Sequence, residues 1–221
     1  MTTRIFLDLD GTLTDPKPGI TRSIRHALTE LGLEAPPEEA LTWCIGPPLA
    51  ESLTHLTGGD PERAAEALTL YRARFGEVGL FENAVCPGII EAMMAMRATG
   101  AKLYLATSKP HVYATRIVAH FGLAPILDGV FGSELDGTRA QKPDLLAHAL
   151  AETGGPGGVA VMVGDRRHDI EGARANRIPA LGVLWGYGGE AELRQARADA
   201  LVETPGDLLG AIADILQGAA P

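Results

Sequence analysis

The stretch IFLDLDGT at residues 5–12 decides the fold, because a short apolar run passes directly into two carboxylates and a glycine. Residues 5–9 are apolar apart from Asp8, which is typical of a strand buried on both faces of a parallel sheet. Asp8 and Asp10 stand two positions apart, so their side chains start on one face of that strand. Gly11 lets the chain turn sharply just after them. We therefore expect a buried strand that ends in a pair of carboxylates.

Three further apolar runs show the same pattern of a buried strand: residues 102–106, 159–163 and 180–185. Helical patterns lie between them, at residues 89–99, 112–120, 144–152 and 169–176. This alternation predicts an α/β fold whose core is a Rossmann-like parallel sheet wound with helices. A run at residues 200–202 is expected to add an edge strand, and GGPGG at residues 154–158 to form an exposed loop.

The first strand is separated from the next one by a long stretch that reads almost entirely as helix. Turn residues open this stretch at Asp15-Pro16 and close it at Pro87-Gly88. We expect residues 1–15 and 85–221 to form the core and residues 16–84 to form an inserted, all-helical cap domain. The helices expected in the cap are residues 20–31, 37–44, 48–56 and 61–75, the last with Asp60 as its N-cap and Pro61 in its first turn.

Composition narrows the class of protein and its partners. Hydrophobic residues make up 46% and charged residues 21%, as in ordinary globular domains. The net charge of -9 repels phosphate backbones, so nucleic acid is not an expected partner. We also expect no membrane association, two free thiols and a cytoplasmic location, because there is no long apolar run, no pattern of a signal peptide and no CxxC spacing. Whether the protein is a monomer or a homodimer stays open.

Reactive side chains stand where the buried runs end. Thr107-Ser108-Lys109 follows the second run, and Gly164-Asp165 follows the third, with Asp169 one helical turn later. Ligands of parallel sheets bind outside the carboxyl ends of the strands, so these groups are expected to meet the first carboxylate pair. Carboxylates gathered there would repel one another, and a hard cation with oxygen ligands such as Mg²⁺ would remove the repulsion. Lys142-Pro143 opens a predicted helix and adds a candidate cation.

Four stretches of the chain resemble the four motifs of the haloacid dehalogenase-like hydrolases: DLDGTLTD at residues 8–15, LATSKP at 105–110, QKPDLL at 141–146 and VGDRRHD at 163–169. The resemblance spans the whole chain and is greatest to the phosphatase branch with a helical cap after the first strand. It implies that Asp8 attacks phosphorus and forms an aspartyl phosphate. Asp10 would protonate the leaving oxygen and then deprotonate the attacking water. Dehalogenases of this superfamily lack an acid at the position of Asp10, so the resemblance favours a phosphatase.

The resemblance also implies roles for the later motifs. Thr107 would hydrogen-bond the phosphoryl oxygens, and Lys142 would offset their charge. Mg²⁺ would be held by Asp8, the Asp10 carbonyl and Asp165, and it would be steadied by Asp169. Gly11 and Ser108 are expected to contact the substrate, although Ser108 stands where many relatives have Asn. Arg166, Arg167 and His168 are bulkier and more basic than the usual pattern and would adjust the site; for the two arginines a solvated positive turn stays open as the alternative.

Cap residues are expected to choose the substrate by closing over the nucleophile. The candidates are Arg22, Arg25 and Gly46, where Gly46 belongs either to a substrate-facing loop at residues 45–48 or to an ordinary turn. Trp185 and Tyr187 are expected either to stack on a base or to cover the edge of the sheet.

The expected activity is hydrolysis of a small-molecule phosphate ester, most like a phosphoglycolate phosphatase. Two alternatives stay open: a 5'-nucleotidase-type phosphatase, and a phosphosugar mutase that returns the phosphoryl group to a sugar hydroxyl. A non-catalytic phosphate-binding module would lack the nucleophile or a metal ligand. Neither is missing from this sequence.

Overall fold

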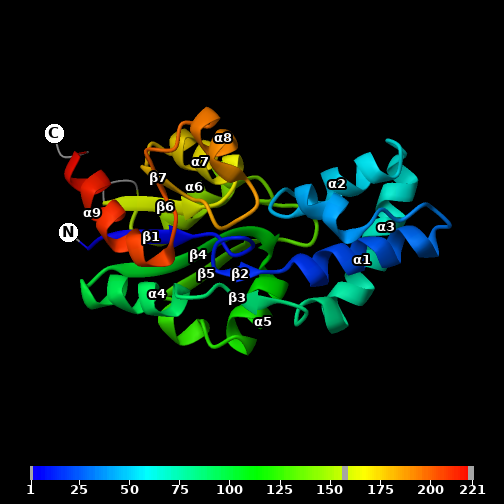
Figure 1. The fold of residues 1–221 in the computed structure, drawn as a ribbon, viewed down its shortest axis with the longest axis horizontal. Coiled ribbons are helices and arrows are strands. Elements are labelled where there is room, and N and C mark those ends of the chain that lie inside the picture. Colours follow the sequence, from blue (N-terminus) through cyan, green and yellow to red (C-terminus); the bar gives the residue numbers. More distant parts are fainter. Residues whose placement is uncertain (1, 156–158, 219–221) are drawn as a thin grey trace.

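The computed structural model of the protein describes residues 2–155 and 159–218. The core is a six-stranded sheet in the order β5-β4-β1-β6-β7-β8, in which every neighbouring pair is parallel (Figure 1). The strands are β1 (Arg4–Leu7), β4 (Lys102–Pro110), β5 (Gly129–Ser133), β6 (Ala160–Gly164), β7 (Ala180–Val183) and β8 (Ala200–Val202). Because β1 lies between β4 and β6, the three strands that end in reactive residues are neighbours. The predicted α/β fold with a parallel sheet is confirmed.

Helices cover both faces of this sheet. One face is covered by α6 (Lys142–Glu152), α7 (Arg167–Ala175) and α8 (Gly189–Gln195), which pack around the buried Phe6. The other is covered by α4 (Ile89–Ala98), α5 (His111–His120) and α9 (Leu208–Gly218), which share a core with Ile5 and Leu7. Successive β1 side chains thus enter opposite layers, as the pleat of a strand requires. Two short 3₁₀ turns, η3 (Ala124–Ile126) and η4 (Pro205–Asp207), complete the core.

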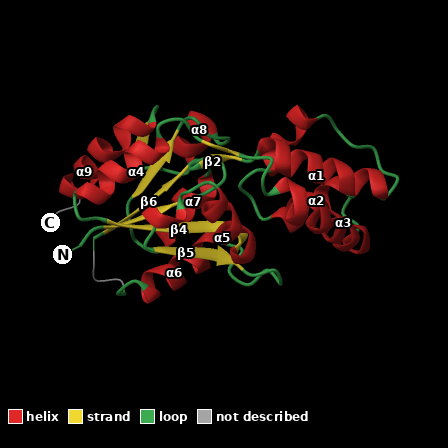
Figure 2. Ribbon diagram, turned by 90° about the horizontal axis from the view of Figure 1, so that it is seen from below, coloured by secondary structure: helices red, strands yellow, loops and turns green. Residues whose placement is uncertain are grey.

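A helical insertion follows β1, as predicted. It contains α1 (Lys17–Glu30), the 3₁₀ helix η1 (Glu38–Cys44), α2 (Leu49–Leu56), α3 (Pro61–Arg74) and the π-helical turn η2 (Phe75–Gly79). Figure 2 shows α1, α2 and α3 grouped at one end of the sheet. The predicted cap of α3 is present, since Asp60 Oδ1 accepts hydrogen bonds from the backbone N–H of Glu62 at 3.0 Å and Arg63 at 3.2 Å.

Two short strands, β2 (Thr14–Asp15) and β3 (Ala84–Val85), pair antiparallel and bring the two ends of the insertion together. The division of the chain into residues 1–15 and 85–221 and residues 16–84 stays a prediction. Of the loop predicted at residues 154–158, residues 156–158 lie outside the described part. No helix in the described part of the chain has the length and apolar character that a membrane span requires.

Several elements differ from the sequence-based expectations. The segment at residues 37–44 is a 3₁₀ helix, and α8, α9, β2, β3 and β5 were not predicted. β5 contains two glycines in five residues, which hides the apolar pattern of a strand. Gly132 is needed there, because a Cβ at this position would lie 2.6 Å from the Cα of His111 at the start of α5. The close packing of strand and helix therefore removes the side chain that would have marked the strand.

Candidate active site

Gly11 shapes the loop that follows β1. Its φ angle is +84°, and its N–H donates to the Thr14 carbonyl at 2.7 Å. A Cβ at Gly11 would lie 2.7 Å from Cγ of Asp165, which follows β6. Only glycine therefore combines this backbone conformation with such a close approach of the two loops.

Three carboxylates gather at these strand ends. Asp8, Asp165 and Asp169 are at most 3% exposed, and each offers an oxygen within 4.8 Å of the others. Burial, followed by the charges of Asp169 and Asp8, raises the pKa of Asp165 well above its ordinary value. Several buried carboxylate oxygens around one point form the donor set that a hard divalent cation requires. The cluster fits the metal site predicted from the sequence, and Asp169 lies beside the other two carboxylates as expected of a supporting residue.

Lys142, the first residue of α6, supplies the positive charge beside this cluster. Its Nζ donates to Asp8 Oδ1 at 2.8 Å and to the Ala106 carbonyl at 2.7 Å, and it lies 2.5 Å from Asp169 Oδ1. Burial alone would lower the pKa of Lys142, but the charges of Asp169 and Asp8 outweigh it and raise that pKa. Lys142 therefore stays protonated beside the candidate nucleophile. Lys142 pairs with Asp8 and Asp169 but not with Asp165, so a divalent cation would still improve the charge balance of the three carboxylates.

Thr107 and Ser108 belong to the last four residues of β4, which pairs with β1 on the edge opposite β6. Thr107 is buried, and its Oγ1 accepts a hydrogen bond from the backbone N–H of Lys109 at 3.3 Å. Ser108 lines the cavity described below, and its carbonyl accepts from Ser133 Oγ at 2.7 Å. The predicted contacts of Thr107 and Ser108 with a phosphate ester remain predictions.

Asp10 has a partner that the sequence did not single out. Its Oδ2 lies 2.9 Å from the Nζ of Lys109, and both side chains are buried. Asp10 Oδ1 is also buried, and it has no hydrogen-bond partner among the described residues. Burial raises the pKa of Asp10, against the opposing effect of the Lys109 charge. A carboxyl group whose protonated form is favoured suits a general acid.

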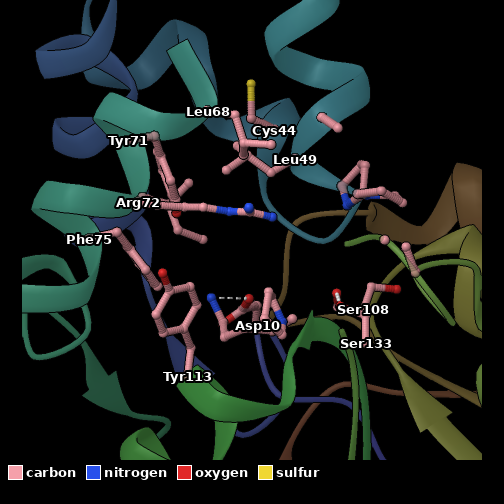
Figure 3. Close-up of a pocket in the computed structure, with 18 of the residues that line it drawn as sticks. Asp10, Cys44, Leu49, Leu68, Tyr71, Arg72, Phe75, Ser108, Tyr113 and Ser133 are labelled. Atoms are coloured by element: carbon pink, nitrogen blue, oxygen red, sulfur yellow. Dashed lines mark hydrogen bonds and ion pairs between the residues drawn. The ribbon is translucent and has the colours of Figure 1, made fainter. Parts of the chain in front are cut away.

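A cavity of about 110 Å³ lies between the insertion and the strand ends, and Asp10 belongs to its wall (Figure 3). Most of its lining is apolar or aromatic, with Lys109, Arg72 and Glu134 as the other charged residues. The lining from the insertion includes Cys44, Gly46, Pro47, Pro48, Leu49, Leu68, Tyr71, Arg72 and Phe75. The insertion therefore covers the candidate acid/base with a largely apolar surface.

The three cap residues predicted to contact the substrate, Gly46, Arg22 and Arg25, differ in their position relative to the cavity. Gly46 lines the cavity, whereas Arg22 and Arg25 are absent from its described lining. Contact of Gly46 with a substrate stays a prediction. Arg22 instead pairs with Glu38 at 3.3 Å and Glu82 at 3.1 Å. The cap arginine in the wall is Arg72 on α3, whose Nη2 donates to the Leu135 carbonyl at 2.6 Å. Only the tertiary structure distinguishes these arginines.

Arg166 and Arg167, which the sequence left open, have different surroundings. Arg166 is 8% exposed, and its Nε lies 2.9 Å from Glu192 Oε1. Its Nη1 donates to the carbonyl of Ile45 in the loop at residues 45–48, hereafter the cap loop. A Cβ at Gly46 would lie 2.7 Å from Arg166 Cγ, so the cap loop fits against this side chain. The interpretation as a solvated turn is wrong for Arg166 and holds for Arg167, which is exposed.

Trp185 and Tyr187 pack on the loop after β1. Trp185 Nε1 donates to the Thr12 carbonyl at 3.1 Å, and the Tyr187 hydroxyl donates to Asp15. The backbone N–H of Tyr187 also donates to Asp165 Oδ2 at 2.7 Å. Both residues therefore hold the loops that carry the carboxylates in place. Neither residue is in the described lining of the cavity. β7, which precedes them, lies between β6 and β8, so they do not follow an edge strand, and stacking on a base stays a prediction.

The parallel sheet, the helical insertion and the buried carboxylate cluster define a phosphoryl-transfer hydrolase of the α/β class. A family model described as haloacid dehalogenase-like hydrolase matches residues 3–176, and the chain belongs to this family. The resemblance noted in the sequence is thereby confirmed. Within the family the chain is a phosphatase that acts on phosphoric monoesters.

Proteins similar to this chain carry several names. A 5'-nucleotidase from Pseudomonas aeruginosa is 46% identical over 190 residues, which cover 86% of each chain. The tyrosine-protein kinase PtkA of Mycobacterium tuberculosis is 42% identical over 83% of this chain and 62% of its own length. A crystal structure described as a predicted phosphatase from Clostridium acetobutylicum has a TM-score of 0.91 at 35% identity, covering 98% of this chain and 99% of the other. Proteins named phosphoglycolate phosphatase are more distant, such as that of Caulobacter vibrioides at 32% identity over 83% of this chain and 79% of the other.

Proposed function

We propose that the protein is a Mg²⁺-dependent phosphatase that hydrolyses small-molecule phosphate esters through an aspartyl phosphate on Asp8. The observation that carries the proposal is the buried cluster of Asp8, Asp165 and Asp169 with the Nζ of Lys142 2.8 Å from Asp8. In the proposal Asp8, Asp165 and the Asp10 carbonyl hold Mg²⁺, and Asp169 supports it. Bound Mg²⁺ would offset negative charge on the phosphoryl group and on the carboxylates.

The residues divide the reaction into two displacements. In the first, a carboxylate oxygen of Asp8 bonds to phosphorus as the bond from phosphorus to the leaving oxygen breaks, and Asp10 gives that oxygen its proton. In the second, Asp10 takes a proton from water, the water oxygen bonds to phosphorus, and the bond to Asp8 breaks to release inorganic phosphate. Lys142 stays charged beside Asp8 throughout, and Thr107 orients the phosphoryl oxygens.

For the substrate we favour the 5'-nucleotidase-type alternative over phosphoglycolate. The relative named 5'-nucleotidase is 46% identical, whereas the phosphatases named for phosphoglycolate are 22–32% identical. The cavity wall agrees with this preference, because Leu49, Leu68 and Tyr113 present apolar surface to the leaving group.

The test is release of inorganic phosphate from a panel of nucleoside 5'-monophosphates, phosphoglycolate and sugar phosphates, ranked by kcat/KM. We expect a nucleotide to rank first, turnover to stop when EDTA removes the metal, and Asp8→Asn to be inactive. Asp60→Asn is the matched control, because asparagine caps a helix as well as aspartate and Asp60 lies on the surface at the start of α3. Turnover by Asp8→Asn at the wild-type rate would refute the proposal.

Two further experiments test whether a molecule other than water accepts the phosphoryl group. Product analysis with glucose phosphates tests the mutase alternative, in which a sugar hydroxyl replaces water. A tyrosine-containing peptide tests an acceptor of the kind suggested by the name of the PtkA relative. Transfer to either acceptor faster than to water would replace hydrolysis as the proposed reaction.

A further inference from the structure

Lys109 is held between the acid/base and an aromatic ring from the insertion. Its Nζ lies 2.9 Å from Asp10 Oδ2 and 4.6 Å from the centroid of the Phe75 ring. Lys109 is 8% exposed and Phe75 is 2% exposed, so water hardly reaches this contact. A cation–π contact stabilises more strongly when the ammonium is desolvated than when it is exposed, because solvent no longer competes for the charge.

The position of Phe75 is itself tightly determined. It begins the π-helical turn η2, in which the N–H of Leu80 donates to the Phe75 carbonyl at 2.9 Å. Its ring stacks on Tyr71 at 5.1 Å and meets the edge of Tyr113 at 5.5 Å. A Cβ at Gly79 would lie 2.8 Å from the Phe75 ring, so a glycine is needed where this turn packs. One face of the ring is thus covered by Tyr71, and the cation lies over the ring as well.

We propose that Phe75 is a positioning residue that acts through Lys109 on Asp10. Phe75 fixes the ammonium of Lys109, and Lys109 fixes Oδ2 of Asp10. Asp10 Oδ1, which is buried and has no hydrogen-bond partner in the described part of the chain, is then the oxygen left to carry the transferred proton. This inference rests on the proposed function, in which Asp10 transfers the proton.

The arrangement links the cap to the chemistry. Phe75 belongs to the insertion, whereas Lys109 and Asp10 belong to the core. Figure 3 shows Phe75 and Tyr113 at one side of the cavity, next to Asp10. Without the cap in this position, Lys109 would lose the ring and Asp10 would lose the fixed orientation of its carboxyl group. Proton transfer would therefore be efficient only with the cap in place.

The kinetic test is Phe75→Leu, which keeps an apolar side chain and removes the aromatic face. We expect kcat for a phosphate ester of an alkyl alcohol, whose leaving oxygen needs a proton, to fall about tenfold, the size of a desolvated cation–π contact, with KM changed by less than about twofold. Lys109→Met should lower kcat as well, and the double variant should lose no more than Lys109→Met alone, because the ring acts only through the lysine. Phe81→Leu is the matched control, since Arg116 lies over the Phe81 ring at 5.6 Å and neither residue lines the cavity in its described extent.

A second readout does not depend on activity. The chain has four lysines, Lys17, Lys102, Lys109 and Lys142, so lysine-labelled protein gives few NMR signals. The ε-methylene signal of Lys109 should be shifted upfield by the Phe75 ring in the wild type, and this shift should disappear in Phe75→Leu. If the wild type hydrolyses no ester but the shift behaves this way, the proposed function fails and the positioning contact stands. Unchanged kcat in Phe75→Leu, or losses that add in the double variant, would overturn the inference.

Discussion

Replacing Gly11 with alanine is expected to damage both stability and turnover, through two separable effects. The first is the backbone conformation, because Gly11 has a φ of +84°, where a side chain is disfavoured. The second is the collision of the new Cβ with the carboxylate of Asp165, whose Cγ would be 2.7 Å away. Asp165 would have to move out of the carboxylate cluster.

Gly100 provides the matched control. It has a φ of +87° in an exposed turn after α4, and a Cβ there would meet nothing within 4 Å. Gly100→Ala should therefore show only the backbone effect, about 1–2 kcal/mol, which lowers the Tm by roughly 2–8 °C in a protein of this size. Gly11→Ala should show the same loss of stability together with a further decrease in Tm, because Asp165 is displaced.

Thermal unfolding and steady-state kinetics with a phosphate ester and Mg²⁺ separate the two variants. Gly100→Ala should keep the wild-type kcat. For Gly11→Ala we expect kcat/KM to fall about a hundredfold, since a displacement of about 1 Å at a reacting centre has an effect of that order. The reasoning would be refuted if Gly11→Ala matched Gly100→Ala in both Tm and turnover.

Three further outcomes are expected. The hydrogen bond from Arg74 lowers the pKa of Glu82 below 4.5, so its stabilising effect is fully present above that pH and is lost as the pH falls through the lowered value. Glu82→Gln should therefore reduce the free energy of unfolding by about 0.5–1 kcal/mol at pH 7 and by progressively less in acidic urea titrations; a constant difference would contradict this. Burial raises the pKa of Cys44 to about 11, so a disulfide reagent should label this thiol in folded protein at pH 8 far more slowly than in urea, and equal rates would be the contrary result. Arg166→Lys should loosen the cap loop and raise KM severalfold, with Arg167→Lys as the unaffected control; equal KM values in both variants would show that the loop does not depend on Arg166.

The sequence predicted the sheet well because its strands are buried on both faces. Runs such as residues 5–9 and 159–163 are apolar throughout except where chemistry requires otherwise, and they correspond to β1 and β6 within one or two residues. β5 lacks this signal, because Gly132 had to accommodate the start of α5. The two-residue strands β2 and β3 are too short to produce any periodic pattern.

The site was predictable where its residues follow one another closely at a strand end. Asp8, Asp165 and Asp169 meet as the parallel sheet required. Lys109 was missed as a partner of Asp10, because its importance depends on Phe75, a residue of the insertion that only folding brings close. For the same reason the sequence could not show which arginine of the cap lines the cavity. Arg22 and Arg72 have the same chemistry, and the packing of their helices decides which one reaches the cavity.

Chemical trapping of the intermediate tests the central claim most directly. During turnover of a phosphate ester with Mg²⁺, acid quenching followed by borohydride reduction should convert a phosphorylated aspartate to homoserine, which mass spectrometry can locate in the N-terminal peptide. With an aryl phosphate, whose leaving oxygen departs without a proton, Asp10→Asn should increase the trapped fraction, because this variant lacks the base for the second displacement. We predict homoserine at position 8 and unmodified aspartate at positions 10, 165 and 169. Steady release of phosphate by the wild-type enzyme with no modification at position 8 would contradict the account.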